Sequence, residues 1–129
     1  MADHEQLALW AADCAERALA FFEAEHPDDC RPRNAIEAVR QWRIGNLSVP
    51  EARKFAFAAH SAARAAVKPA AIAAARSAGH AAATAHVATH ARHAANYAIK
   101  AITFVQQEND AERDWQIRQL PPHLRDIVS

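Results

Sequence analysis

Residues 77–98 read SAGHAAATAHVATHARHAANYA, a stretch in which alanine is the commonest residue and proline is absent. The same bias runs through the whole chain, since 35 of its 129 residues are alanine and only 2 are glycine. Alanine is the best helix former, and glycine is the residue that sheet proteins use most often in turns. The composition therefore predicts an all-α fold, a compact antiparallel bundle of about five to six alanine-rich helices in a single domain, 1–129.

Capping signals mark the first three helices. Asp3 is a good N-cap for a first helix that continues to about residue 24. Pro32 suits the first turn of a second helix, and Gly45 is a natural residue to follow the end of that helix. Ser48 and Glu51 have the spacing of a capping box, in which each side chain accepts a hydrogen bond from a backbone amide of the first turn. A third helix should begin there.

The helical pattern then runs without interruption from Pro69 to about residue 107. One helix of that length would be roughly 55 Å long, too long for a domain of this size. We therefore expect a kink or break, either near Gly79 or within residues 88–94. Asp110 has the character of a cap for a last helix that Pro121 closes, and the tail beyond it is long enough for about one more turn.

Alanine on a helix face lets two backbones approach closely, because no bulky side chain holds them apart. Such a core buries little apolar area per residue, so larger side chains must supply a disproportionate share of the stability. We expect these to be Trp10, Phe21, Phe22, Trp42, Phe55, Phe57, Tyr97, Phe104 and Trp115.

Four histidines, His80, His86, His90 and His93, lie in the alanine-rich stretch. On a continuous helix, His86, His90 and His93 would share one face within about 40°, whereas His80 would point roughly 120° away from His86. His86 and His90 could chelate zinc, nickel or copper, but three ligands on one straight helix are spread too far along its axis for a single ion. A complete metal site would need ligands from elsewhere in the chain.

Three interpretations of this histidine face stay open. The rings can fill space between alanine-rich helices while a ring nitrogen bonds to a carbonyl or hydroxyl, they can form a partner-binding or pH-sensing face, or they can bind a metal. Catalysis has little support, because the sequence has no Gly-rich phosphate loop and no carboxylate near these histidines to orient a base. We expect no enzymatic activity, no cofactor and no resident metal.

Charge is distributed unevenly although the net charge is zero. Residues 1–30 hold eight acids and one base, and residues 31–100 hold eleven bases and two acids. Either the acidic first helix docks beside basic helices, or it offers an acidic face to a basic partner. Nucleic acid is a poor candidate, because phosphate binding needs a net basic footprint that the chain as a whole lacks.

The cysteines and the N-terminus bear on location. Cys14 and Cys30 are the only cysteines, without CxxC spacing, and MADHEQLALW has neither a basic segment nor a long apolar run. Basic residues and histidines interrupt the alanine-rich middle repeatedly, which argues against a membrane span. We expect a cytoplasmic protein that makes no membrane contact, as a monomer or a homodimer.

Three blocks of the sequence occur in an order and spacing that resemble those of a known family. They are WAADCAERAL (10–19) with PDDCRPRNAIEAVRQW (27–42), AGHAAATAHVATHA (78–91), and ERDWQIRQLPPHLRDIV (112–128). They resemble the all-helical putative immunity proteins of the Imm-five-like family, found in bacterial polymorphic toxin systems. The resemblance implies a non-catalytic interaction protein, an antidote that binds and neutralises a cognate bacterial toxin. The alternative is a helical bundle that binds a metal or small ligand with the His86, His90 and His93 face.

If the chain is an antidote, its acidic N-terminal segment is the expected partner-binding surface, because many toxin domains attack nucleic acid and are basic. Electrostatic attraction would then speed association. Carboxylates in the loop should form fewer ion pairs within the domain than those on the helix, so they are the first candidates for contact with the partner. In that order the expected contact residues are Glu25, Asp28, Asp29, Glu23, Asp13 and Glu16.

Overall fold

The computed structural model describes residues 1–106 and 110–128, which form six α-helices and a terminal 3₁₀ helix without any strand. This confirms the all-α bundle. None of the helices in these ranges is both long enough and apolar enough to span a lipid bilayer. The elements are α1 (Asp3–Glu25), α2 (Arg31–Arg43), α3 (Val49–Ala65), α4 (Pro69–Ala83), α5 (His90–Gln106), α6 (Asp110–Arg118) and η1 (Pro122–Val128).

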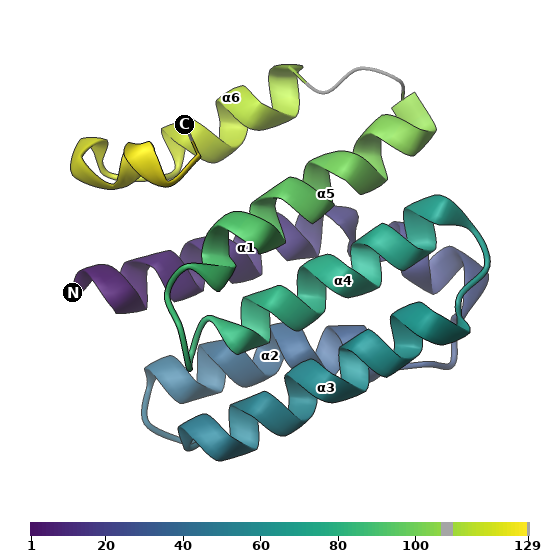
Figure 1. Cartoon of the computed structure of the whole chain (residues 1–129), viewed down its shortest axis with the longest axis horizontal. Helices are drawn as coiled ribbons and strands as arrows, with labels where there is room; N and C mark the ends of the chain where they lie inside the picture. The colour runs from purple at the N-terminus through teal and green to yellow at the C-terminus, as the bar shows by residue number, and fades with distance from the viewer. Residues whose placement is uncertain (107–109, 129) are drawn as a thin grey trace.

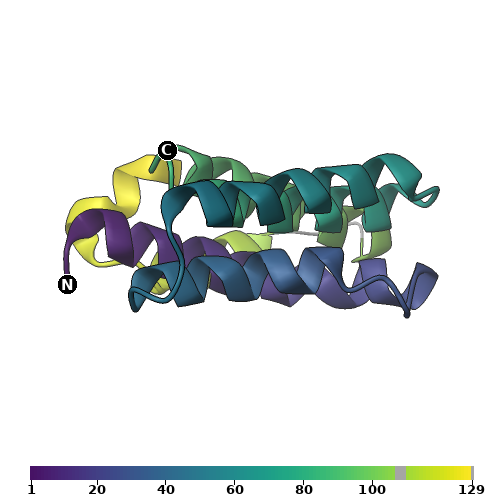
Figure 2. The same ribbon diagram turned by 90° about the horizontal axis from the view of Figure 1, so that it is seen from below.

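The helices form two layers, and consecutive α-helices run in opposite directions (Figures 1 and 2). One layer contains α3, α4 and α5 side by side, and α1 and α2 lie behind it. Helix α4 is central, because it packs against α1, α2, α3 and α5. The chain then returns along α6 toward the start of α1, where His123 of η1 hydrogen-bonds to Asp3 of α1.

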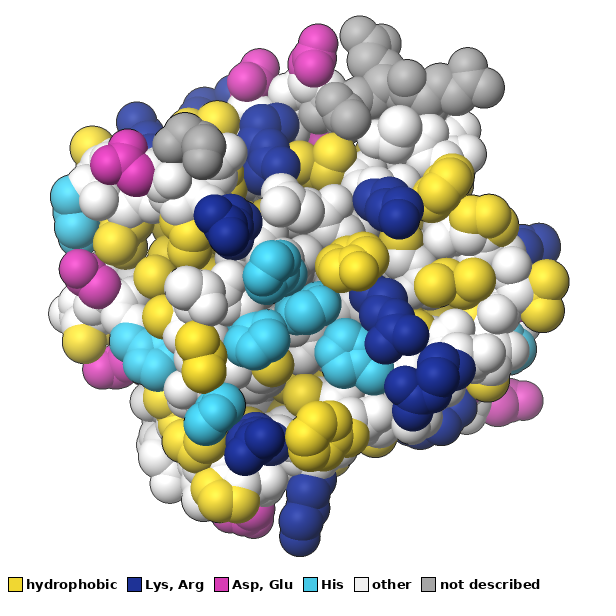
Figure 3. All heavy atoms as spheres, in the orientation of Figure 1, with side chains coloured by type: hydrophobic (Ala, Val, Ile, Leu, Met, Phe, Trp, Pro, Cys, Tyr) yellow, Lys and Arg dark blue, Asp and Glu magenta, His cyan; other side chains and the backbone are white. Residues whose placement is uncertain are grey.

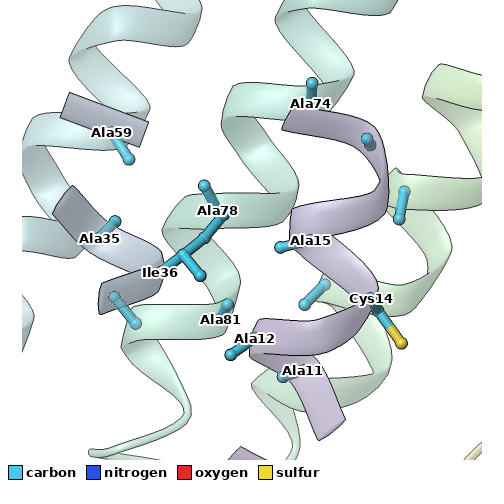
Figure 4. Close-up of a cluster of buried hydrophobic side chains, with 14 of the residues drawn as sticks. Ala11, Ala12, Cys14, Ala15, Ala35, Ile36, Ala59, Ala74, Ala78 and Ala81 are labelled. Carbon is cyan, nitrogen blue, oxygen red and sulfur yellow. The ribbon is translucent and has the colours of Figure 1, made fainter. Parts of the chain in front are cut away.

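Small side chains line the contacts of α4 with its neighbours. No buried side chain of α4 is larger than serine, and on α1 several of the residues facing inward are also alanine. Figure 4 shows alanines of α1 and α4 meeting beside Ile36 of α2. Helices with such faces pack at short axial distance, so many weak dispersion contacts replace a few large ones.

Larger side chains fill the edges of this alanine core. Trp10 and Phe22 are buried, as expected for residues that supply much of the apolar area, and Val39 of α2 is buried as well. The same expectation is wrong for Phe57 and Phe104, whose exposed fractions are 60% and 51%. Both lie on the outer surface of the layer that contains α3 and α5, where no further helix covers them among the described residues.

The local signals fix most helix ends. Ser48 and Glu51 form the capping box, and Gly45 follows α2 with a φ of +86°, a conformation that glycine adopts without a Cβ clash. Pro69 opens α4 as expected. The first helix begins one residue earlier than predicted, because Asp3 lies inside α1 and Ala2 occupies the capping position.

The break in the long helical stretch covers residues 84–89, so the predicted break at Gly79 is wrong and the range 88–94 meets the break only at its edge. Gly79 lies inside α4, where the ring of His60 from α3 rests on its backbone. A Cβ at this position would come within 2.7 Å of that ring. Glycine is therefore present for close approach and not for chain reversal.

The alanine packing predicts an asymmetry between two substitutions on α1. Ala15 is fully buried against α4 (Figure 4), whereas Ala20 is exposed. Ala15→Leu should lower the free energy of unfolding by about 1–3 kcal/mol, because a well-packed core resists added methylenes. Ala20→Leu should change it by less than about 0.5 kcal/mol. Urea denaturation measures both, and equal effects would contradict close alanine packing.

The contact between Gly79 and His60 predicts coupling. In a His60→Ala background, Gly79→Ala should stabilise the protein by about 0.5–1 kcal/mol, the usual helix preference for alanine over glycine. With His60 present, Gly79→Ala should leave the free energy of unfolding unchanged or lower it, because the added Cβ forces the imidazole ring to move. A double-mutant cycle measured by urea denaturation tests this. The prediction fails if Gly79→Ala has the same effect in both backgrounds.

Candidate functional site

Histidines from three helices meet on the outer surface of the α3–α4–α5 layer. The ring centre of His80 lies 5.0 Å from that of His60 and 5.2 Å from those of both His90 and His93. Tyr97 stacks on His80 at 5.3 Å with an interplanar angle of 10°. These four histidines and Tyr97 are called the histidine cluster below. Figure 3 shows histidines gathered at the centre of this face, with Lys and Arg side chains around them.

The structure changes the membership of the predicted histidine face. His86, His90 and His93 do not lie on one continuous helix, because His86 is in the exposed turn between α4 and α5 and His90 begins α5. His80, predicted to point away from the set, is its centre. The cause is the packing of the two helices. Because the chain reverses at residues 84–89, α5 packs against α4, and His80 of α4 faces the histidines of α5.

Hydrogen bonds hold the cluster together. Arg76 donates to Nδ1 of His60 over 2.9 Å, which requires that nitrogen to be unprotonated. The Nδ1 atoms of His80 and His90 are also 2.9 Å apart, so one ring donates and the other accepts. Beneath them, the buried hydroxyl of Ser77 donates to the carbonyl of Ala94 and ties α4 to α5.

The environment keeps these rings neutral. Burial lowers the pKa of His60 to about 4 and that of His80 to about 3, from an ordinary value of 6.5, and nearby positive groups including Arg76 add to both shifts. Burial also lowers the pKa of His90, and repulsion from His93 and His86 adds to the effect. At neutral pH the interior of the cluster therefore carries no charge of its own.

The cluster has a narrow chemical repertoire. A ring with so low a pKa accepts a proton poorly at neutral pH, and the hydrogen bonds described for the ring nitrogens of the cluster go to Arg76 or to another histidine and not to a carboxylate. The described residues contain no group of three or more His, Cys, Asp or Glu side chains arranged to hold a metal ion. The arrangement offers a set of flat rings for packing and hydrogen bonding, and burial disfavours a positive charge on three of them, His60, His80 and His90.

His60 belongs to the cluster and Arg76 bonds to it, but neither was among the residues predicted from the sequence. His60 belongs to α3, more than a dozen residues before the alanine-rich stretch, so helical periodicity could not connect the two. One signal was present: AHSAARAAV (59–67) and GHAAATAHV (79–87) align at their histidines when offset by 20 residues. That alignment pairs His60 with His80, and their rings are in edge-to-face contact.

The carboxylates predicted to contact a partner are mostly engaged within the domain. Arg40 of α2 bonds to both Asp13 and Glu16, and Arg33 forms a bidentate pair with Glu23. Each of these pairs joins α1 to α2. The acidic first helix therefore docks beside a basic second helix, which is the first of the two alternatives that the charge distribution left open.

The loop acids are less free than predicted. The Glu25 carboxylate accepts hydrogen bonds from the backbone amides of Val67 and Lys68, and these bonds lower its pKa. Asp29 pairs with Arg31, and the hydrogen bonds from that side chain lower the pKa of Asp29. The expectation that loop acids are less engaged within the domain than helical ones is thus wrong for both residues, because helix N-termini supply amides and arginines that attract them. Asp28 is exposed.

Comparison with known proteins gives one result. The model of a family described as "Imm-5 like putative immunity protein" matches residues 1–123, which is nearly the whole chain. No curated protein and no solved structure matches the sequence of this chain.

The lowered histidine pKa values predict acid sensitivity. In the unfolded chain these rings take up protons below about pH 6.5, whereas in the folded protein they resist protonation until about pH 4. The unfolded state therefore binds more protons in this window, and the free energy of unfolding should decrease as the pH falls through it. Between about pH 7 and about pH 5, most carboxylates stay ionised and contribute little.

His80→Phe should reduce this dependence, because it removes the ring with the lowest pKa and keeps a flat side chain in its place. The readout is the slope of unfolding free energy against pH, measured by urea denaturation, and not the absolute stability. An identical slope in both proteins would show that the cluster does not control acid sensitivity.

Proposed function

Because the chain belongs to the Imm-5 like putative immunity protein family, we propose that it is a bacterial antidote that binds and neutralises a cognate toxin without catalysis of its own. The observation that carries this proposal is the family match over residues 1–123. The match covers all six α-helices, so the likeness extends over the whole bundle and is not limited to one motif.

The packing of the bundle supports a binding role. A core of closely packed alanine helices fixes the relative positions of the helices, and a preformed arrangement of helices loses less conformational entropy when it binds. Buried polar bonds add to this rigidity. The indole of Trp10 donates to the carbonyl of Gln116, and the side chain of Gln116 donates to Ala95, which links α1, α5 and α6.

The candidate chemistry supports the same proposal. Burial lowers the pKa of His60 and His80, no hydrogen bond from the cluster to a carboxylate is found among the described residues, and the two thiols are unpaired, with Cys14 buried and Cys30 exposed. Burial raises the pKa of the Cys14 thiol, so it is a poor nucleophile. Free thiols suit a reducing compartment, and the proposal places toxin binding in the cytoplasm.

The proposal predicts a stoichiometric, protective complex. The tagged chain, expressed in its native host, should co-purify a protein whose isolated domain arrests growth when expressed alone. Co-expression of the chain should restore growth, and the purified pair should elute together from a sizing column. Mass spectrometry identifies the partner. It also checks that the partner carries no covalent modification after it dissociates from the complex, as binding without catalysis requires.

Two outcomes would contradict the proposal. One is a co-purifying protein whose expression has no effect on growth. The other is protection by amounts of the chain far below those of the toxin, with covalent change in the toxin, because a non-catalytic antidote can neutralise only as much toxin as it can bind.

A further inference from the structure

One layer of the bundle is free of acidic residues over most of its length. From Ala52 to Gln106, which covers α4, α5 and all but the start of α3, the sequence has seven Lys or Arg residues and no Asp or Glu. Five of the eight histidines of the chain also lie here. Six of the seven cations are exposed: Arg53, Lys54, Arg64, Lys68, Arg92 and Lys100.

None of these cations forms an ion pair in the described part of the chain, although Lys68 lies near Glu25 and Lys54 near Glu51, whereas several arginines of the opposite half do. The ion pairs of arginine join α1 to α2 and α6, as in Arg33 with Glu23 and Arg17 with Glu112, or lie within the loop before α2. Three arginines of α2 thus pair with acids of α1. The zero net charge of the chain is therefore the sum of seven positive charges on residues 52–106 and an excess of seven negative charges on the rest of the chain, where many of the acids are paired with arginine.

We propose that the α3–α4–α5 layer is the surface through which the chain binds its toxin, and that it docks on an acidic face of that toxin. This inference rests on the proposed function and adds the interface and the charge of the partner. It replaces the expectation of an acidic interface, since most of those carboxylates are engaged internally.

Contacts tie the cations to the histidine cluster and make one continuous surface. Arg53 lies over the ring of Phe57 and lines a shallow pocket with His60, His86 and His90. Lys100 lies over Tyr97, which stacks on His80. Figure 3 shows this face with basic side chains around the histidines and acidic side chains confined to its margins.

The chemistry of the layer favours a protein over a nucleic acid. Phe57 is 60% exposed beside the pocket, and the pocket itself is lined by apolar atoms of Ala56 and Ala83 as well as by imidazole rings. An apolar side chain flanked by carboxylates would fill the pocket and meet the surrounding cations. Desolvated aromatic anchors with charged groups around them are typical of protein interfaces, and steering by the charges speeds encounter.

The test uses a labelled peptide of glutamates around one central leucine, with single-stranded DNA of similar charge as the competing ligand class. Fluorescence anisotropy gives the affinity of the whole chain at about 50 mM and about 200 mM salt. The variant Arg53→Glu with Lys100→Glu changes two exposed cations of the layer, and Arg118→Glu, on α6, is the control for charge reversal elsewhere. Circular dichroism and thermal unfolding check that each variant is folded.

We expect the peptide to bind more tightly than the DNA and more weakly at high salt. The double variant should lose roughly tenfold or more in affinity, and the control less than about twofold. Phe57→Ala should also lower the affinity for the peptide, without altering how that affinity depends on salt. No peptide binding, tighter binding of the DNA, or equal effects of the double variant and the control would each overturn the inference.

The toxin found by co-purification gives a second and independent readout. Its association rate should fall with salt for the wild-type chain and drop in the double variant, whereas Asp28→Lys should leave it unchanged. If the chain protects against the toxin and the double variant associates at the wild-type rate, the interface is elsewhere and only the inference fails. If no toxin is neutralised, the proposed function fails, whatever the peptide result.

Discussion

Close approach of α4 to four neighbouring helices is the constraint on which the rest of the structure depends. It is possible because the inward side chains of α4 are alanine, serine and glycine. Because no large side chain separates the backbones, α4 can pack against helices of both layers at once. The same closeness brings the ring of His60 onto the backbone of Gly79 and sets His80 against α5. The histidine cluster is thus a consequence of how the core packs.

A core of small residues has a cost in buried area, and polar contacts at the edges offset part of it. Gln116, fully buried on α6, bonds through its side chain to Ala95 and Arg113 and through its carbonyl to Trp10. Buried hydrogen bonds of this kind are directional, so they position α6 more sharply than alanine contacts could. The carboxylate of Glu25 does the same at the start of α4, where it bonds to two backbone amides.

Charge follows the same division into layers. Arginines of α2 pair with four of the acids of α1, and the outer layer keeps its cations exposed around the rings of His60 and His80, which burial holds neutral. Neutral imidazoles matter to this surface, because protonated ones would add repulsion to an already positive layer. The bundle can therefore combine a positive rim with an uncharged, aromatic centre, which is the usual anatomy of a protein interface.

Composition and local signals determined the fold class, most helix ends and the capping box at Ser48, because those features depend on residues within one or two turns of each other. They could not place the break after Ala83 or the partners of His80. Gly79 reads as a breaker in sequence, and only the packed neighbour on α3 explains why it lies within a helix. The pairing of Glu25 and Asp29 likewise required the tertiary fold, since an acid in a loop reads as free until the amides and arginines around it are placed. Helical propensity is a property of a segment, whereas ring contacts, ion pairs and the charge of a face arise from segments far apart in the chain that packing brings together.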